Sequence, residues 1–577
     1  MSEPVLRRAH PALRAPFNVW DLVALALILG VFIAMSHGAR ETFAPLKSLA
    51  TQPISLDPHR LPEYALRTSL RMVAGMVASL VFTFGYAALA AKSRHAEMVL
   101  IPLLDILQSV PVLAFLSITL VWLMALAPGS VLGAEFASIF TVFTAQAWNM
   151  TFSFYQSLKT IPADLEEAAK AFGLTPWQKF WRLEAPFGAP ALIWNMMMSM
   201  AGGWFFVTAS EAFTVGATNV NLPGVGSYIA AANDKQDYVA IGWAVLTMAL
   251  TILLFDQLFF RPLVAWSEKF HVELTASSDP PQSWVLDLLR RTRLMARVGR
   301  PIGEAVRWLA SLRIKTPPLP RRLALSERGQ RTFDVIWISV ILVLVIFAAR
   351  QIFKFVAHTL TWADLLHAVE LGFFTLARVV VLIALASLVW TPVAVWIGLR
   401  PKIAERVQPI AQFLAAFPVN LLYGLVVSGI IAGGLDPNIF LSPLMILGTQ
   451  WYILFNVIAG ASAYPTDLKQ AAASFGVKGW QWWRNVMGPG ILPYFVTGAL
   501  TASGGAWNAA IVSEVASWGD KHLRAAGLGA YIADASTAGD MPRVVMGVAV
   551  MSVFVVALNR TVWRPLYGIA ERRFRFD

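Results

Sequence analysis

The segment from Pro162 to Pro186 reads PADLEEAAKAFGLTPWQKFWRLEAP, and it is a polar island in an otherwise apolar sequence. A second island, from Pro465 to Pro489, reads PTDLKQAAASFGVKGWQWWRNVMGP. The two align without an insertion at a spacing of 303 residues. The chain therefore contains an internal duplication, and we expect the rest of the sequence to be organised around these two segments.

The first copy has the pattern of a short capped helix. Leu165, Ala168, Ala169 and Phe172 follow one another at i, i+3, i+4 and i+7, so they share one helix face. Gly173 then ends the helix, because glycine adopts the left-handed conformation of helix ends without steric cost. The pattern predicts about three helical turns, a sharp bend and a second amphipathic piece. The small alanines predict a face that another backbone can approach closely.

The second copy keeps this pattern with one exchange. Ala471, Ala472, Phe475 and Gly476 stand at the equivalent positions, and Gln470 replaces a glutamate. An amphipathic helix on a membrane surface would explain a single copy. Two copies at matched places in two hydrophobic halves favour a docking function.

Composition predicts an integral membrane protein. Hydrophobic residues make up 57% of the 577 residues and charged residues only 14%, whereas a soluble domain carries about 25% charged residues. The chain has no cysteine, which excludes disulfides, thiolate metal sites and a catalytic thiol. It also has no Gly-Lys dipeptide, so it lacks the phosphate loop of an ATPase, and it shows no HExxH or GxSxG motif. We expect a protein that is not an enzyme, with no metal, no cofactor of its own and no nucleic-acid partner.

Apolar runs predict an all-α architecture of two parallel six-helix repeats, about twelve spans in all. The expected spans of the first half are near 21–35, 67–91, 98–125, 134–158, 188–213 and 238–261, and those of the second are near 333–352, 368–397, 404–432, 436–461, 490–515 and 541–563. Pro111 and Pro418 should kink the third span of each half.

The domains that we expect are a first half at 1–264, a basic linker with interfacial helices at 265–331 and a second half at 332–577. Lys and Arg concentrate in the segments that this topology places inside, and both termini are then cytoplasmic. An even number of spans separates the two polar islands, so both should face the cytoplasm. The linker should rest on anionic lipid.

The duplicated motif resembles the signature of the membrane subunits of bacterial ATP-binding-cassette (ABC) importers, E-A-A-x3-G-x9-I-x-L-P, with a MetI-like permease fold. The matching residues are Glu167, Ala168, Ala169, Gly173, Leu183, Ala185 and Pro186 in the first copy and Ala471, Ala472, Gly476, Val486 and Pro489 in the second. In that family the segment is a coupling helix, here within 162–186 and 465–489, which implies that two separate ATPase subunits, carrying ATP and Mg²⁺, dock at 162–182 and 465–485. The docking residues that the resemblance implies also include Glu166, Phe172, Gln470 and Phe475.

Ionisable and polar residues inside spans are costly, so they are candidates for a pathway or gate. They are Arg71, Asp105, Gln108, Asn149, Glu211, Arg378 and Glu514. Glu211 and Glu514 each stand thirteen residues before the first glycine of a G-x-G-x-Tyr-Ile turn. These acids could bond to that turn structurally, or they could serve the pathway. Arg71 and Arg378 could attract an anion or pair with the acids, and we favour pairing.

The sequence is most similar to the nitrate, sulfonate and taurine branch of these importers. The resemblance implies a permease of a bacterial inner membrane that carries a small oxyanion or organic anion, delivered by an external binding protein. An ion-gradient-driven secondary transporter can also be built from two parallel six-span repeats, and it is the alternative. A membrane enzyme or scaffold would need a constellation of catalytic residues that the sequence does not show.

Overall fold

The computed structural model describes residues 54–128, 130–215, 218–270, 283–314 and 327–574. The predicted first span at 21–35 lies outside these residues. The described chain is almost entirely helical, and it packs into two compact units. Among the described residues, one unit contains 161–190, 255–270 and 283–314, and the other contains 54–160, 191–254 and 327–574, with the gaps given above. The units follow local packing and not the boundary between the repeats, so each is described by itself.

The helices of the first half alternate long spans with short connecting pieces. They are α3 (Leu61–Lys92), α4 (Arg94–Ser109), α5 (Val112–Leu126), α6 (Leu132–Lys159), α7 (Ala163–Ala171), α8 (Pro176–Lys179), the π-helical turn η3 (Phe180–Glu184), α9 (Ala185–Glu211), α10 (Val225–Asp234), α11 (Tyr238–Phe255), the π-helical turn η4 (Asp256–Phe260) and α12 (Arg261–Ser267). The 3-10 turn η2 (Pro58–Arg60) precedes α3, and η5 (Glu268–Phe270) follows α12. Two linker helices come next, α13 (Trp284–Arg291) and α14 (Arg293–Ser311).

The second half repeats this order. Its helices are α15 (Glu327–Ala357), α16 (Trp362–Gly398), α17 (Pro401–Ala416), α18 (Tyr423–Gly433), α19 (Pro437–Phe440), α20 (Leu444–Leu447), α21 (Gln450–Ser462), α22 (Thr466–Ser474), α23 (Gly479–Trp482), α24 (Gly488–Ser513), α25 (Leu528–Ala538), α26 (Met541–Leu558) and α27 (Arg564–Phe574). The turns η6 (Val419–Leu422), η7 (Trp483–Met487) and η8 (Asn559–Trp563) join them.

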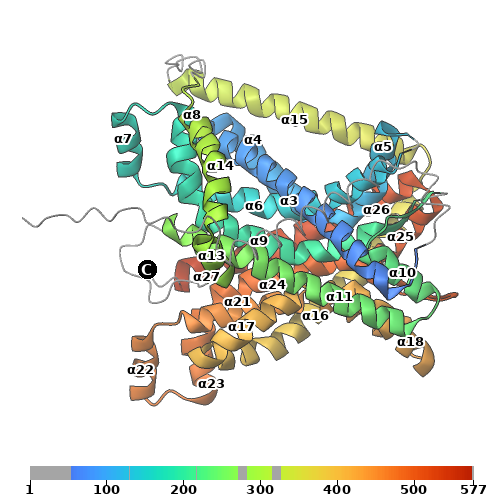
Figure 1. Cartoon of the computed structure of the whole chain (residues 1–577). Helices are drawn as coiled ribbons and strands as arrows, with labels where there is room; N and C mark the ends of the chain where they lie inside the picture. The colour runs from blue at the N-terminus through green and yellow to red at the C-terminus, as the bar shows by residue number, and fades with distance from the viewer. Residues whose placement is uncertain (1–53, 129, 216–217, 271–282, 315–326, 575–577) are drawn as a thin grey trace, which may run out of the picture. The chain divides into compact units, whose positions relative to one another are not determined.

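A two-stranded hairpin follows the long core helix of each half. β1 (Ala212–Val215) pairs antiparallel with β2 (Thr218–Asn221), and β3 (Val515–Trp518) pairs antiparallel with β4 (Lys521–Arg524). In Figure 1 the short helix α22 lies at one end of helices α21 and α24, and α25, which follows the second hairpin, lies at the other end.

Six described helical segments are long and apolar enough to cross a membrane, and two bent pairs raise the number to eight. α6 and α24 do not pass this test, because they lie inside the bundle and carry small and polar residues there. On α3, Gly75 lets α6 approach so closely that an added Cβ would lie 2.5 Å from Val142 Cγ1. The spans are therefore assembled by close contact of small residues, as is usual in membranes.

The prolines end helices where kinks were predicted. α4 stops at Ser109 and α5 begins after Pro111, and the equivalent break at Pro418 bends the second half by 73°. In the predicted span at 436–461, α19, α20 and α21 form a bent series with a 42° break, and the bent pair together is apolar enough to count as one span. Pro443 and Gly448 lie at the junctions, and both residues interrupt a regular helix.

Candidate functional site

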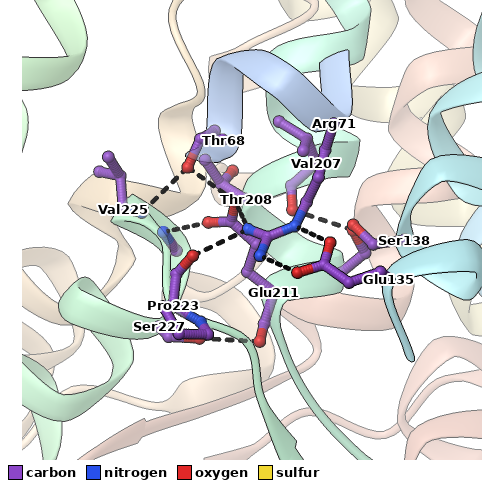
Figure 2. A network of polar contacts seen from close by, with 12 residues as sticks. Thr68, Arg71, Glu135, Ser138, Val207, Thr208, Glu211, Pro223, Val225 and Ser227 are labelled. Atoms are coloured by element: carbon purple, nitrogen blue, oxygen red, sulfur yellow. Dashed lines mark hydrogen bonds and ion pairs between the residues drawn. The ribbon is translucent and has the colours of Figure 1, made fainter. Parts of the chain in front are cut away.

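A buried ionic cluster lies in the first half, where α3, α6 and the end of α9 meet (Figure 2). The Arg71 guanidinium binds Glu135 through two hydrogen bonds, Nε to Oε2 at 2.6 Å and Nη2 to Oε1 at 2.7 Å. Its Nη1 donates to Glu211 Oε1 at 2.7 Å and to the Pro223 carbonyl at 3.0 Å. The three side chains are only 3%, 8% and 0% exposed, so one cation is enclosed by two acids.

Glu211 also ties this cluster to the glycine turn that follows the hairpin. Its carboxylate accepts the Thr68 hydroxyl at 2.7 Å and the Gly226 N–H at 2.7 Å. An added Cβ on Gly224 would lie 2.3 Å from Glu211 Cδ, so only glycine lets the backbone approach the acid this closely. The G-x-G turn and the glutamate thus form one structural unit.

The second half contains the equivalent unit. Arg378 Nη1 donates to Glu514 Oε1 at 3.1 Å, and the same carboxylate accepts the Thr375 hydroxyl at 2.8 Å and the Ala530 N–H at 3.0 Å. An added Cβ on Gly527 would lie 2.2 Å from Glu514 Oε2. The structure thus contains both Arg–Glu pairs that we favoured from the sequence.

One difference separates the two clusters. Asn438 takes the place of Glu135 in the second half, and the Nη2 of Arg378 donates to its Oδ1 at 3.5 Å. The first cluster therefore has two carboxylates around its arginine, and the second has one carboxylate and an amide. The sequence reasoning missed both residues, because the two halves carry different residues at this position and the repeat spacing therefore does not mark it.

A cavity of about 380 Å³ lies within the larger unit, between equivalent elements of the two repeats. Most of its lining residues form pairs at the repeat spacing, such as Thr208 with Ile511 and Asn233 with Ser536. Asn420 Nδ2 donates to Thr208 Oγ1 at 3.0 Å, whereas the equivalent positions hold Leu113 and Ile511. The cavity wall formed by Thr208 and Asn420 is thus polar, whereas the wall formed by the repeat-equivalent residues Leu113 and Ile511 is apolar.

None of the seven predicted pathway residues is among the described residues that line this cavity. Arg71, Glu211, Arg378 and Glu514 lie in the two ionic clusters instead. Asp105 forms an ion pair with Arg564, and Gln108 donates to the Asp105 carboxylate at 3.4 Å. Asn149 is an exposed residue of α6. The positions of Asp105, Gln108 and Asn149 therefore do not support the pathway role, which stays a prediction. Helix kinking and polarity alone do not reveal which face of a span turns inward.

The duplicated segments form the two short helices α7 and α22 with the same cap. The Leu174 N–H donates to the Ala169 carbonyl at 3.1 Å and the Gly173 N–H to the Lys170 carbonyl at 3.0 Å, which is a Schellman motif. In α22 the N–H groups of Val477 and Gly476 make the matching bonds to Ala472 and Ala473 at 3.0 Å each. Gly173 has φ +60° and Gly476 has φ +65°, as the sequence predicted.

The predicted docking residues lie on different faces of these two helices. Phe172 and Phe475 are 82% and 84% exposed, and Ala168 and Ala471 are exposed beside them. Glu167, Gln470 and both glycines are also exposed, while Glu166 is half-buried. Ala169 and Ala472, however, are only 5% and 7% exposed, because they face their own unit. The small-residue face expected to meet a partner is therefore partly used for internal packing.

The first segment also contains an ionic clasp. Lys179 Nζ lies 2.6 Å from Glu166 Oε1 and 3.5 Å from Glu184 Oε1, so it joins α7 to η3. The hydrogen bond from Lys179 lowers the pKa of the Glu166 carboxyl. In the second copy the three positions are Lys469, Trp482 and Met487, which cannot form this clasp.

The chain has two repeats of apolar helices, and each repeat has a buried Arg–Glu unit and an exposed capped helix. Both repeats line one cavity. This arrangement is that of a membrane permease with a duplicated transport core. Residues 73–261 and 390–576 each match the family described as the binding-protein-dependent transport system inner membrane component. The two matches together cover more than half of the chain, and the chain belongs to this family. The chain is thus a permease component of the ABC importer type.

Several curated permeases are similar to parts of this chain. The nitrate import permease protein NrtB of Synechocystis sp. is 23% identical over 267 residues, which cover 44% of this chain and 92% of that protein. The bicarbonate transport system permease protein CmpB of Synechococcus elongatus is 22% identical over 201 residues, or 35% and 66% of the two chains. The glycine betaine transport system permease protein OpuAB of Bacillus subtilis is 25% identical over 191 residues, or 32% and 62%.

Proposed function

We propose that this chain forms the whole membrane pathway of an ABC importer and that α7 and α22 dock two separate ATPase subunits. The observation that carries this proposal is the pair of Schellman-capped helices, each with a phenylalanine more than four-fifths exposed. An exposed phenylalanine on a rigid, short helix suits a hydrophobic pocket in a partner. The proposal places the motor on another polypeptide, and the absence of a phosphate loop from this sequence supports that assignment.

The proposed substrate is a small oxyanion or organic anion, delivered by an external binding protein. Two of the relatives are named for nitrate and bicarbonate. The exposed strand β4 carries Lys521, His522 and Arg524, where the first repeat has Thr218, Asn219 and Asn221. Among the described residues, the cavity lining contains no lysine or arginine and one carboxylate, Asp234, so an anion would pass without being held tightly. Selection would then rest with the binding protein.

In this proposal both coupling helices and both termini face the cytoplasm of a bacterial cell, and residues 265–331 link the halves on that side. ATP binding would close the two ATPase subunits, move the coupling helices together and open the cavity outward. Hydrolysis would reverse the movement. The clasp of the first segment makes the two docking sites chemically unequal.

Co-purification from membranes tests the docking. Ala168→Asp together with Ala471→Asp places a charge on the exposed face, and we expect loss of an ATPase-sized partner and of ATP-dependent uptake. Lys170→Asp with Ala473→Asp is the matched control, since these positions lie about 200° around the helix from the first pair. Equal loss in both pairs would point to misfolding.

Uptake that continues without any ATPase partner would contradict the proposal and favour an ion-gradient transporter. That alternative predicts acids free to exchange protons. In both halves the buried glutamate at the end of the core helix is instead paired with an arginine. The pairing therefore favours the importer.

A further inference from the structure

The linker between the halves is attached to the first coupling segment. The indole N–H of Trp177 donates to the Leu309 carbonyl at 2.7 Å, and Gln178 Nε2 donates to the Ser311 carbonyl at 2.9 Å. Leu309 and Ser311 lie in the last turn of α14, where carbonyl groups lack partners within the helix. Side chains of the coupling segment therefore cap the C-terminal end of the linker helix.

The other end of the linker is also anchored. Ser283 caps α13 through a bond from the Leu286 N–H at 3.3 Å, and Val285 and Leu288 are 8% exposed. The indole N–H of Trp284 donates to Gln257 Oε1 at 3.4 Å. The linker helices thus run from the end of the first half's last span to the bend of its coupling segment.

The second coupling segment has the same Trp-Gln pair without such a helix. Trp480 is 78% exposed and Gln481 is also exposed, and among the described residues no hydrogen bond joins either side chain to another helix. The attachment, like the ionic clasp, therefore distinguishes the two segments.

The exposed surface of the linker helices combines positive charge with tryptophan. Residues 265–331 contain 13 Lys and Arg against 6 Asp and Glu. On α14 and the residues after it, Arg300, Arg307 and Arg313 are exposed together with Trp308, which is 65% exposed, and Ile314. Basic residues interspersed with tryptophan are typical of helices that lie at an anionic membrane surface.

We propose that α13 and α14 form a strap that binds anionic phospholipid headgroups and holds the first coupling segment, but not the second, against the membrane surface. The name strap refers to residues 284–314. The role of the first coupling segment in ATPase docking rests on the proposed function. The hydrogen bonds of the strap and its contact with lipid are independent of that function. Because the strap holds only the first coupling segment, docking of the ATPase subunits would move mainly the second coupling segment.

Cysteine cross-linking tests the attachment, because the chain contains no native cysteine. The full-length chain with Gln178→Cys and Ser311→Cys, in membranes, is treated with a short bifunctional thiol reagent, and mass spectrometry measures the joined peptides. We expect a cross-link, and none for the control pair Gln481→Cys and Ser311→Cys. Failure to cross-link the first pair would overturn the strap.

Two conservative variants test the bonds themselves. Trp177→Phe removes the indole donor toward α14, and Gln178→Glu replaces the amide donor with a carboxylate that the Ser311 carbonyl repels. The glutamate keeps the acceptor oxygen for the Thr175 N–H, which lies 3.1 Å away. Each lost bond should raise the open fraction of the strap about fivefold, measured as proteolysis within the linker. Trp480→Phe and Gln481→Glu should change nothing. Equal proteolysis in all four variants would contradict the attachment.

A polarity-sensitive fluorophore tests the partner. It is placed at Trp308→Cys in nanodiscs of phosphatidylglycerol or of phosphatidylcholine, without ATPase present. We expect a blue-shifted emission in phosphatidylglycerol that high salt reverses, and no such shift for a label at Trp480→Cys. An emission that shifts only when the ATPase is added would overturn the lipid contact and assign this face to the ATPase. Because the ATPase is absent from the first measurement, its result does not depend on the proposed function.

Discussion

Removal of the buried arginine should affect the two halves very differently. Arg71→Met would leave Glu135 and Glu211 as two enclosed carboxylates about one guanidinium's width apart. Arg378→Met would leave Glu514 alone, still bonded to a threonine hydroxyl and a backbone N–H. Methionine is chosen because it keeps the length of the side chain without its charge.

The magnitudes follow from burial and bond number. Arg71 is 3% exposed and makes four bonds of 2.6 to 3.0 Å, and loss of one partner from a buried pair costs about 3–5 kcal/mol. Arg378 is 13% exposed, and its bonds of 3.1 and 3.5 Å are longer. Loss of a hydrogen bond to a charged group costs about 2 kcal/mol. We therefore expect Arg71→Met to reduce the free energy of unfolding by about 2 kcal/mol more than Arg378→Met does.

Unfolding of the purified chain in detergent, followed with a denaturant series, measures both variants. A second substitution makes the test specific: Glu135→Gln should restore about half of the loss caused by Arg71→Met, because it removes one of the two unpaired charges. A double-mutant cycle isolates this coupling, since the side chains are in contact. Equal losses for the two arginines, or no rescue by Glu135→Gln, would refute the reasoning.

Other predictions concern the turn and the coupling helices. Gly224→Ala should abolish the yield of folded protein, because an added Cβ would lie 2.3 Å from the buried carboxyl carbon of Glu211. Gly242→Ala is the control, since its Cβ would meet nothing within 4 Å, and it should give a normal folded peak in size-exclusion chromatography. Ala169→Glu should lower the unfolding midpoint, while Ala168→Glu at the exposed neighbour should leave that midpoint unchanged and cost only ATPase co-purification. The lowered pKa of Glu166 means that its ion pair stabilises the segment above the carboxyl's unfolded pKa and that this stability is lost as the pH falls through the folded pKa. The side chain is 40% exposed, so we expect no more than about 0.5 kcal/mol between pH 7 and pH 4, and Glu166→Gln should remove this pH dependence of unfolding.

Local rules and the repeat spacing predicted much of the structure. Helix α7 and its left-handed Gly173 follow from short-range preferences, which act regardless of the surrounding fold. The pairing of Arg71 with Glu211 could be proposed because both halves place an arginine and a glutamate within membrane spans. A charge there is energetically costly unless it has a partner.

Contacts between distant segments could not be predicted in this way. Glu135 stands near the start of a predicted span, where an acid has an ordinary explanation at the positive end of the helix dipole. The burial of Ala169 depends on the face that α7 turns toward its own unit. The bonds of Trp177 and Gln178 to α14 join residues more than 130 positions apart, and no sequence pattern specifies them.

The differences between the halves have a common physical basis. In a symmetric dimer of identical subunits, each substitution appears twice and must be compatible with itself across the two-fold axis. Fusion of the halves removes that requirement, so the Thr208–Asn420 bond can face Leu113 and Ile511 across the cavity. The features kept in both halves are those whose failure would leave a charge or a backbone group unpaired in the membrane: the arginine–glutamate pair, its threonine and the glycine turn. The contacts that diverge at the coupling segments are ones that water, lipid or another subunit can replace, whereas the exchange of Glu135 for Asn438 lies within the ionic clusters. A partner that distinguishes the two coupling segments must therefore act through the divergent contacts, and the variants at Gln178 and Gln481 compare such contacts directly.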